Sequence, residues 1–255
     1  PRQINILKAL GGEQPVYGHI PMILGPDGEK LSKRHGAVSV VQYHEEGFLP
    51  DAMINYLARL GWSHGDDELF SREQLVEWFD STNLSKSAAQ FDPEKLKWVN
   101  AHYMKQAPKE LLLSDLQTRL EKDSVNTAEG PKLVDVLDVV LERASTLVQL
   151  RDEAALFYNV PNVNIEELKP MLEEAGVRAA LVEFNEGLNT VDWNVEALNG
   201  LVKTTIKNHG LKMPKLAMPL RLMLTGITQT PSIDKVMNLL GKHTVQTRIA
   251  QGLQS

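Results

Sequence analysis

The residues with the clearest chemical potential form one short stretch, residues 25–36, with the sequence GPDGEKLSKRHG. Its first half is rich in turn-forming residues, and its second half places Lys30, Lys33 and Arg34 around the hydroxyl of Ser32. Glycine permits tight turns and lets the backbone come close to a ligand. Two ammonium groups three residues apart can converge on one anion, and serine adds a hydroxyl donor. This composition favours phosphate binding, for example to a triphosphate during nucleotidyl transfer.

The same stretch has a second interpretation, because a short basic run is also typical of a solvated surface turn. The spacing is not that of the P-loop, which requires G-x-x-x-x-G-K followed by serine or threonine. From these residues alone, both a phosphate-binding loop and a plain surface turn remain open.

The distribution of charge points to a polyanion more clearly than the total does. The formal net charge is -6, which argues against a protein that coats nucleic acid in bulk. Two windows, residues 30–44 and 197–233, nevertheless contain no acidic residue. Local basic faces of this kind suit a phosphate backbone, although two solvated faces could also be basic by chance. The second window contributes five cations, namely Lys203, Lys207, Lys212, Lys215 and Arg221.

Composition excludes several classes of protein. The chain has 255 residues and no cysteine, so disulfides and thiolate metal sites are ruled out and a reducing, cytoplasmic setting is expected. The seven histidines show no paired ligand spacing, and we expect no metal site. No run of residues approaches the length of a membrane span. Because the chain begins with Pro1 rather than methionine, we expect a fragment or a processed product.

The elements that must position these residues are mostly helical. Only residues 16–24 are rich in β-formers, and they predict a short buried strand leading into the basic loop. Capping boxes at Ser39–Gln42 and Ser71–Gln74 predict two helix starts. Three of the four tryptophans lie in apolar helical stripes, so we expect them in the core. Further helices are predicted over residues 4–10, 50–60, 108–120, 131–150, 179–188, 194–209, 219–224, 232–240 and 244–253, and from residues 92 and 164 onward.

The motif KLSKR, residues 30–34, resembles the second signature loop of the class I aminoacyl-tRNA synthetases, usually written K-M-S-K-S. Several further segments resemble bacterial glutamyl-tRNA synthetases and extend the likeness over nearly the whole chain. Leucine at position 31 and arginine at position 34 are usual for the glutamyl branch. The segments are HIPMILG (19–25), RHGA (34–37), YLARLGWSHG (56–65), KLKWVN (95–100), MPLR (218–221), LTG (224–226) and LGK (240–242).

The resemblance implies roles for individual residues. In this family the signature loop closes over ATP, so Lys30, Ser32 and Lys33 would hold its phosphates, with Mg²⁺ present in the full-length enzyme. Arg221 matches the arginine of the family's P-L-R segment, which reads the anticodon. Thr230 falls in the segment that also lies near the anticodon bases. The resemblance makes Arg143 another anticodon reader, and the lysines of the second basic window would add contacts to tRNA(Glu).

The resemblance also implies a division of a mainly α chain. It predicts a small α/β remnant of the catalytic domain with the signature loop (1–36), a stem-contact domain (37–107), and an all-helical anticodon-binding region in two parts (108–157 and 158–255). The family's H-I-G-H signature, glutamate pocket and acceptor-binding insertion are not in this chain. We therefore expect the chain alone to bind no ATP and to form no glutamyl-adenylate. We expect a monomer that binds tRNA(Glu) and no membrane.

Two alternatives remain open at this stage. The chain could be a helical interaction module that uses its basic faces for proteins or acidic surfaces, without a role in RNA binding. It could also belong to a glutaminyl-tRNA synthetase, which shares the loop but reads its anticodon with β-barrels. The helical capping signals after Pro108 speak against the second alternative.

Overall fold

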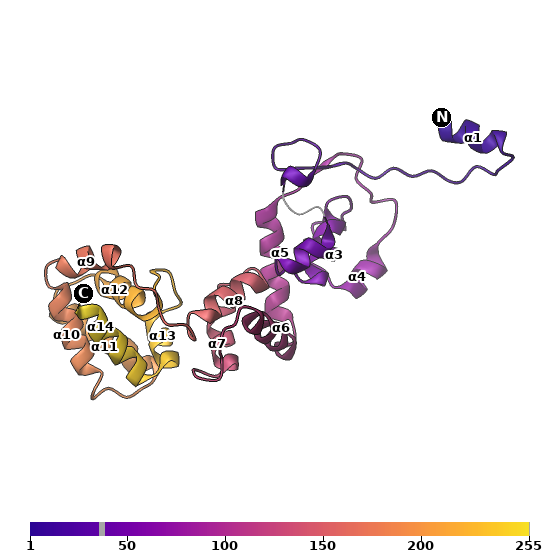
Figure 1. Ribbon diagram of the computed structural model, residues 1–255. Helices are drawn as coiled ribbons and strands as arrows, with labels where there is room; N and C mark the ends of the chain where they lie inside the picture. Colours follow the sequence, from indigo (N-terminus) through magenta and orange to yellow (C-terminus); the bar gives the residue numbers. More distant parts are fainter. Residues whose placement is uncertain (36–38, 255) are drawn as a thin grey trace. The chain divides into compact units, whose positions relative to one another are not determined.

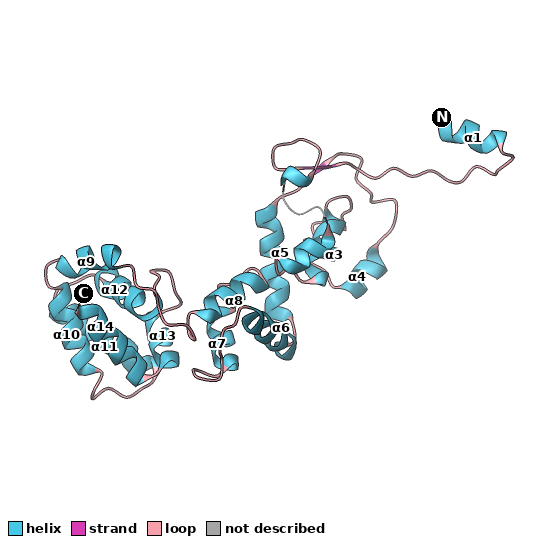
Figure 2. Cartoon of the chain, in the orientation of Figure 1, coloured by secondary structure: helices cyan, strands magenta, loops and turns pink. Residues whose placement is uncertain are grey.

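Helices dominate the computed structural model, which describes residues 1–35 and 39–254 (Figures 1 and 2). The described chain divides into two compact units, residues 1–42 with 50–99, and residues 43–49 with 100–255. The division falls within two helices, α2 (Val40–Glu45) and α5 (Pro93–Gln106). Gly36 and Ala37, which carry part of the family motif, lie outside the described residues. The predicted division into four segments remains a prediction.

The first unit combines short helices with one small sheet, shown in Figure 2. Its strands, β1 (Ile23–Leu24) and β2 (Ala89–Gln90), are parallel, with Ile23 opposite Ala89. Its other elements are α1 (Arg2–Ala9), the 3₁₀ turn η1 (Lys33–His35), the first half of α2 (Val40–Glu45), α3 (Pro50–Arg59), α4 (Arg72–Trp78) and the start of α5.

Aromatic side chains and backbone bonds hold this first unit together. The rings of Tyr56 and Phe91 meet edge to face with centroids 5.3 Å apart. The Tyr56 hydroxyl donates to the carbonyl of Asp92 at 2.9 Å and accepts from its amide at 2.7 Å. Because Asp92 also caps the start of α5 through its side chain, Tyr56 fixes where that helix begins.

The buried strand predicted over residues 16–24 is wrong for most of its length. Only residues 23 and 24 are strand, while Val16 and Ile20 are largely exposed to solvent. The partner strand in the described chain, β2, is two residues long, and Leu24 forms one further antiparallel bridge, with Lys30. A β-forming sequence without further partner strands or a covering layer has nothing to bury its apolar side chains against.

The second unit is helical throughout its described part. Three helices, α6 (Lys109–Lys122), α7 (Leu133–Val140) and α8 (Leu147–Ala155), pack on one another. The other six helices, orange to yellow in Figure 1, form one group, in which α12 contacts each of the remaining five. Their bounds are α9 (Ile165–Glu173), α10 (Val177–Gly187), α11 (Val195–Asn208), α12 (Met213–Thr225), α13 (Ile233–Leu240) and α14 (Lys242–Leu253).

The continuous helix predicted over residues 131–150 is also wrong, because the chain breaks between α7 and α8. Thr146 begins α8 as an N-cap, with its side chain accepting from the amide of Gln149. The fully buried Asn100 donates to the carbonyl of Ser145 at 2.7 Å, and the amide of Leu147 donates to the carbonyl of Gly47 at 2.9 Å. These bonds come from distant parts of the sequence and satisfy the backbone groups that a continuous helix would have paired internally.

Most predicted helix starts are confirmed. Ser71 and Gln74 form the complete capping box at the start of α4. Asn164 caps α9, and Pro50 is the first residue of α3. In contrast, α12 begins at Met213, six residues before the predicted start at Pro219. Pro214 takes the N-terminal position that suits proline, while Pro219 lies buried inside the helix.

No helix in residues 1–35 or 39–254 is long and apolar enough to cross a membrane.

Candidate nucleic-acid interface

The basic loop is shaped by a tight backbone turn. The amide of Gly25 donates to the carbonyl of Glu29 at 2.7 Å, and the amide of Leu31 donates to the carbonyl of Ile23 at 3.0 Å. Gly28 adopts a positive φ of 79°, which glycine tolerates without strain. The turn is tied to the second strand by Gln90, whose amide donates to the carbonyl of Pro26.

This turn presents the predicted phosphate ligands at the surface. Lys30 and Lys33 are exposed, and Ser32 is partly buried beside them. Arg34 is engaged with Asp27 through an ion pair of 3.1 Å. Neither lysine forms an ion pair with a residue that the structure describes. The loop therefore offers two ammonium groups to an anion, which fits the phosphate-binding interpretation.

Arg221 lies half-buried on α12, near enough to a second arginine, Arg143, for the two charges to interact. The Nε atom of Arg221 is buried and has no hydrogen-bond partner among the described residues. Burial lowers the pKa of the Arg221 guanidinium, and the charge of Arg143 lowers it further, while Asp234 acts in the opposite direction. Two guanidinium groups from distant parts of the chain thus lie within electrostatic reach of one another, which suits an acceptor-rich or anionic ligand.

Arg143 reaches this site from the break between α7 and α8. Its side chain is 36% exposed, and its Nε lies 3.4 Å from the Oε2 of Glu153 on α8. Had α7 and α8 formed the predicted continuous helix, Arg143 would lie within regular helical backbone. The capping of α8 by Thr146 and the bond from Asn100 to Ser145 instead fix the short segment that carries it.

Asp234 and Thr230 fix the backbone next to Arg221. Asp234, at the start of α13, accepts a hydrogen bond of 2.8 Å from Asn199 on α11. Burial raises the pKa of Asp234, but bonds from Ser232 and Asn199 outweigh it, so that pKa lies below its usual value. Thr230 is 5% exposed, and its hydroxyl donates to the carbonyl of Pro231 at 2.9 Å. The structure therefore places Thr230 in a buried turn that leads into α13.

The four lysines of the second basic window do not gather around Arg221. Lys203 and Lys207 lie one turn apart on α11 and are exposed. Lys212 precedes α12, nine residues before Arg221, which corresponds to about 13 Å along a helix axis. Lys215 forms an ion pair with Glu174. The window is a set of separate surface cations.

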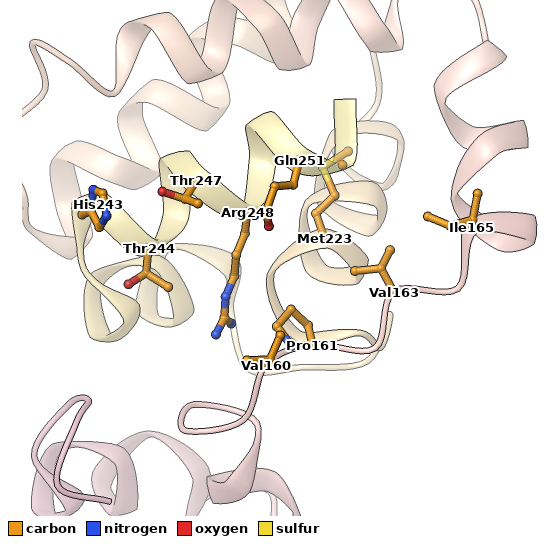
Figure 3. A pocket seen from close by; sticks show the side chains of 11 residues that line it. Val160, Pro161, Val163, Ile165, Met223, His243, Thr244, Thr247, Arg248 and Gln251 are labelled. Atoms are coloured by element: carbon orange, nitrogen blue, oxygen red, sulfur yellow. The ribbon is translucent and has the colours of Figure 1, made fainter. Parts of the chain in front are cut away.

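A cavity of about 470 Å³ lies in the second unit between α14 and residues 160–165, as shown in Figure 3. Arg248 extends across it from α14 toward Val160 and Pro161. Its guanidinium donates to the carbonyl of Leu224 and, at 3.1 Å, to that of Asn159, and burial lowers its pKa. Sequence reasoning missed this arginine, although a polar stripe at helical spacing marks the face of α14: Thr244, Thr247, Arg248 and Gln251.

The tryptophans only partly follow their predicted burial. Trp62 is 3% exposed and lies in the core of the first unit. Trp98 is 48% exposed, with the ammonium group of Lys95 4.3 Å from its ring centroid. The expectation that Trp98 belongs to an apolar helical stripe is wrong, because Leu96 and Val99 form the buried face of α5. Its exposed ring leaves a surface for stacking.

Metal ligands are not clustered in the part of the chain that the structure describes. No group of three or more histidine, aspartate or glutamate side chains there is arranged to hold a metal ion.

Two known protein families match separate parts of the chain. Residues 104–253 match the family model described as an anticodon binding domain. The chain belongs to the anticodon binding domain family. Residues 1–98 match a second family model, the catalytic domain of class I tRNA synthetases (E and Q). The predicted combination of a catalytic-domain remnant with a helical anticodon-binding region is confirmed.

Individual relatives support the same assignment. A glutamate–tRNA ligase of Dechloromonas aromatica is 56% identical over 250 residues, which cover 98% of this chain and 54% of that protein. One of Herminiimonas arsenicoxydans is 54% identical over 253 residues, 99% of this chain and 54% of that protein. The anticodon-binding chain therefore spans about half the length of the curated relatives it matches. The predicted resemblance to bacterial glutamyl-tRNA synthetases is confirmed.

A solved structure shows the same fold. The crystal structure of a glutamate tRNA ligase from Elizabethkingia meningosepticum, in complex with its amino acid, matches with a TM-score of 0.82 at 27% identity. The match covers all of this chain and 54% of that one. Neither the helical interaction module nor the β-barrel-containing glutaminyl enzyme is favoured by these matches.

Proposed function

We propose that this chain is the tRNA-binding portion of a glutamate–tRNA ligase, and that its second unit reads the anticodon of tRNA(Glu). One observation carries the proposal: Arg143 is close enough to Arg221 for its charge to lower the pKa of Arg221, and both arginines lie within the region that matches the anticodon binding domain. The names of the relatives support the choice of glutamate as the amino acid.

The chemistry of the arginine pair suits the unpaired bases of an anticodon loop. A guanidinium presents a planar set of donors, which can hydrogen-bond the acceptors on a base edge or stack on its ring. Because the Nε of Arg221 is buried, this side chain is packed against the protein rather than freely solvated. A fixed donor discriminates between bases better than a mobile one, because mismatched acceptors leave it unpaired.

The exposed lysines would contribute affinity without sequence discrimination. Lys203, Lys207 and Lys212 are solvent-exposed and separated, so each can meet a different phosphate. Lys215 can do so only by giving up its ion pair with Glu174. Contacts of this kind position an RNA backbone and weaken as salt concentration rises.

The basic loop belongs to a second step, the activation of glutamate by ATP in the longer protein. The exposed ammonium groups of Lys30 and Lys33, with the hydroxyl of Ser32, fit a triphosphate. These residues would hold the phosphates, while bound ATP with Mg²⁺ would supply the adenylyl group to the glutamate carboxylate, with pyrophosphate as the leaving group. We do not expect glutamyl-adenylate from this chain by itself. We further propose that it acts as a monomer in the cytoplasm.

Substituting Arg221 tests the central assignment. If Arg221 reads a base edge, Arg221→Ala should lower the preference for tRNA(Glu) over other tRNAs by about 1–3 kcal/mol, because one donor pair to the correct base is lost. Filter binding at constant salt measures this preference.

Lys203→Ala is the matched control, because it also removes one cation. We expect it to weaken binding to all tRNAs alike and to reduce the salt dependence by about one phosphate contact. An equal loss for every tRNA in Arg221→Ala would make Arg221 another phosphate contact. A wild-type chain that binds all tRNAs equally would contradict the proposed function itself.

A further inference from the structure

The buried carboxylate of Glu153 has no role in the function proposed above, yet it lies directly against Arg143. Its side chain is only 14% exposed, and its Oε2 has no hydrogen-bond partner among the described residues. Arg143 Nε lies 3.4 Å from Oε2, close enough for charge attraction but not aligned as a hydrogen bond. Burying a carboxylate costs desolvation free energy. If this position on α8 served packing alone, an apolar residue would be more stable there.

A chain of side chains along α8 holds Glu153 in its orientation. Gln149 accepts from both the amide and the hydroxyl of Ser145, at 2.9 and 3.0 Å, through its Oε1. Its amide nitrogen must then point the other way, where it donates to Oε1 of Glu153 at 3.5 Å. Gln149 therefore binds Oε1 of the Glu153 carboxylate, and Oε2 remains for Arg143.

The second arginine explains why such an anchor is needed. Burial lowers the pKa of Arg221 most, and repulsion between Arg221 and Arg143 lowers it further. Without a counter-charge, Arg143 would gain by turning away from Arg221 into solvent. Contact through Nε leaves both terminal nitrogens of Arg143 available to a ligand.

We propose that Glu153 is a positioning residue, which holds Arg143 beside Arg221 so that the two guanidinium groups can act on one RNA base. This inference rests on the proposed function. It assigns Glu153 to base discrimination rather than to RNA affinity or to folding.

Removing the Glu153 charge should have one effect if the charge merely repels RNA and a different effect if Glu153 positions Arg143. Removing a negative charge near an RNA site tightens binding to every tRNA. Loss of positioning instead lowers the preference for the correct anticodon. Glu142 supplies the matched control, since it is the neighbour of Arg143 in the segment between α7 and α8, carries the same charge as Glu153 and pairs with Lys105 at 2.6 Å instead of Arg143.

The experiment compares Glu153→Gln, Glu142→Gln and Arg143→Gln in the 255-residue chain, singly and with Glu153→Gln and Arg143→Gln combined. Binding is measured to a tRNA(Glu) transcript and to the same transcript with a changed anticodon. We expect Glu153→Gln to lower the preference at least about fivefold, Glu142→Gln to leave it unchanged, and the double variant to be no worse than Arg143→Gln alone. Additive losses in the double variant, or an undiminished preference in Glu153→Gln, would overturn the inference.

A second readout needs no RNA. Titration of the ¹³C-labelled Glu153 carboxyl should give a higher pKa in Arg143→Gln than in the wild type, because Arg143 lowers that pKa in opposition to burial. An unchanged pKa would show that the two side chains do not interact and would overturn the inference even if the wild type showed no anticodon preference. A wild type without preference would count against the proposed function, whatever this titration gives.

Discussion

At the scale of the residue, the cations differ by what surrounds them rather than by their number. Arg143 lies beside the largely buried carboxylate of Glu153 and Arg221 is half-buried near an opposing charge on Asp234, whereas Lys203 and Lys207 are simply exposed. Sequence spacing placed Arg221 and the four lysines in one basic window. Only the fold separates them into an organised pair with Arg143 and a set of dispersed surface charges.

The lowered pKa of Asp234 predicts how its contribution to stability depends on pH. Its folded-state pKa lies below the unfolded value, so its contribution to stability is present above the unfolded pKa and is lost as pH falls through the folded pKa. Asp234→Asn should lower the free energy of unfolding by about 1–2 kcal/mol near neutral pH, and the difference should shrink below about pH 4. Urea unfolding at several pH values measures both effects.

The control for this prediction is Asp138→Asn. Asp138 forms an exposed ion pair with Lys109, which water screens, and its loss should cost less than about 1 kcal/mol. The assigned stabilising role of the Asp234 carboxylate is wrong in either of two cases. In the first, Asp234→Asn lowers the free energy of unfolding as little as Asp138→Asn does. In the second, the stability difference between Asp234→Asn and the wild type grows as pH falls.

At the scale of the element, local signals were sufficient for helix starts and insufficient for the break that carries Arg143. Capping residues such as Ser71 and Asn164 act within their own turn, so the sequence predicts them. The break between α7 and α8 depends on Asn100 and Gly47, which are far away in sequence. No local pattern reports such a contact, and the apolar periodicity of residues 131–150 therefore predicted one helix.

Gly47 tests how closely these segments approach. It has a φ of 88°, and a Cβ there would lie 2.6 Å from the amide nitrogen of Val148 and 2.7 Å from that of Leu147. Gly241 has a similar φ of 80° but has open space where its Cβ would be. We expect Gly241→Ala to cost about 1–2 kcal/mol through backbone strain, and Gly47→Ala to cost at least about 3 kcal/mol through strain and overlap.

Thermal and urea unfolding of the two variants measure the difference. The structure shows residues 43–49 packed against the start of α8. Equal losses of stability in Gly47→Ala and Gly241→Ala would contradict that packing.

At the scale of the whole molecule, the mainly helical character and the catalytic remnant followed from the sequence, but the arginine site did not follow from residue patterns. Arg143 and Arg221 are 78 positions apart, and only the family resemblance connected them before the fold did. The predicted strand over residues 16–24 failed for a related reason, because β-structure depends on partners elsewhere in the chain. Long-range pairing is the part that composition and periodicity do not encode.

The central claim is that the second unit reads the anticodon through Arg143 and Arg221. It is tested most directly by the ratio of dissociation constants of this chain for a tRNA(Glu) transcript and for the same transcript with a changed anticodon. Both RNAs present the same body and the same phosphates, so the lysines contribute equally to each. We predict at least about tenfold tighter binding to the unchanged transcript, with most of the preference lost in Arg221→Ala. Equal dissociation constants for the two transcripts would contradict the account.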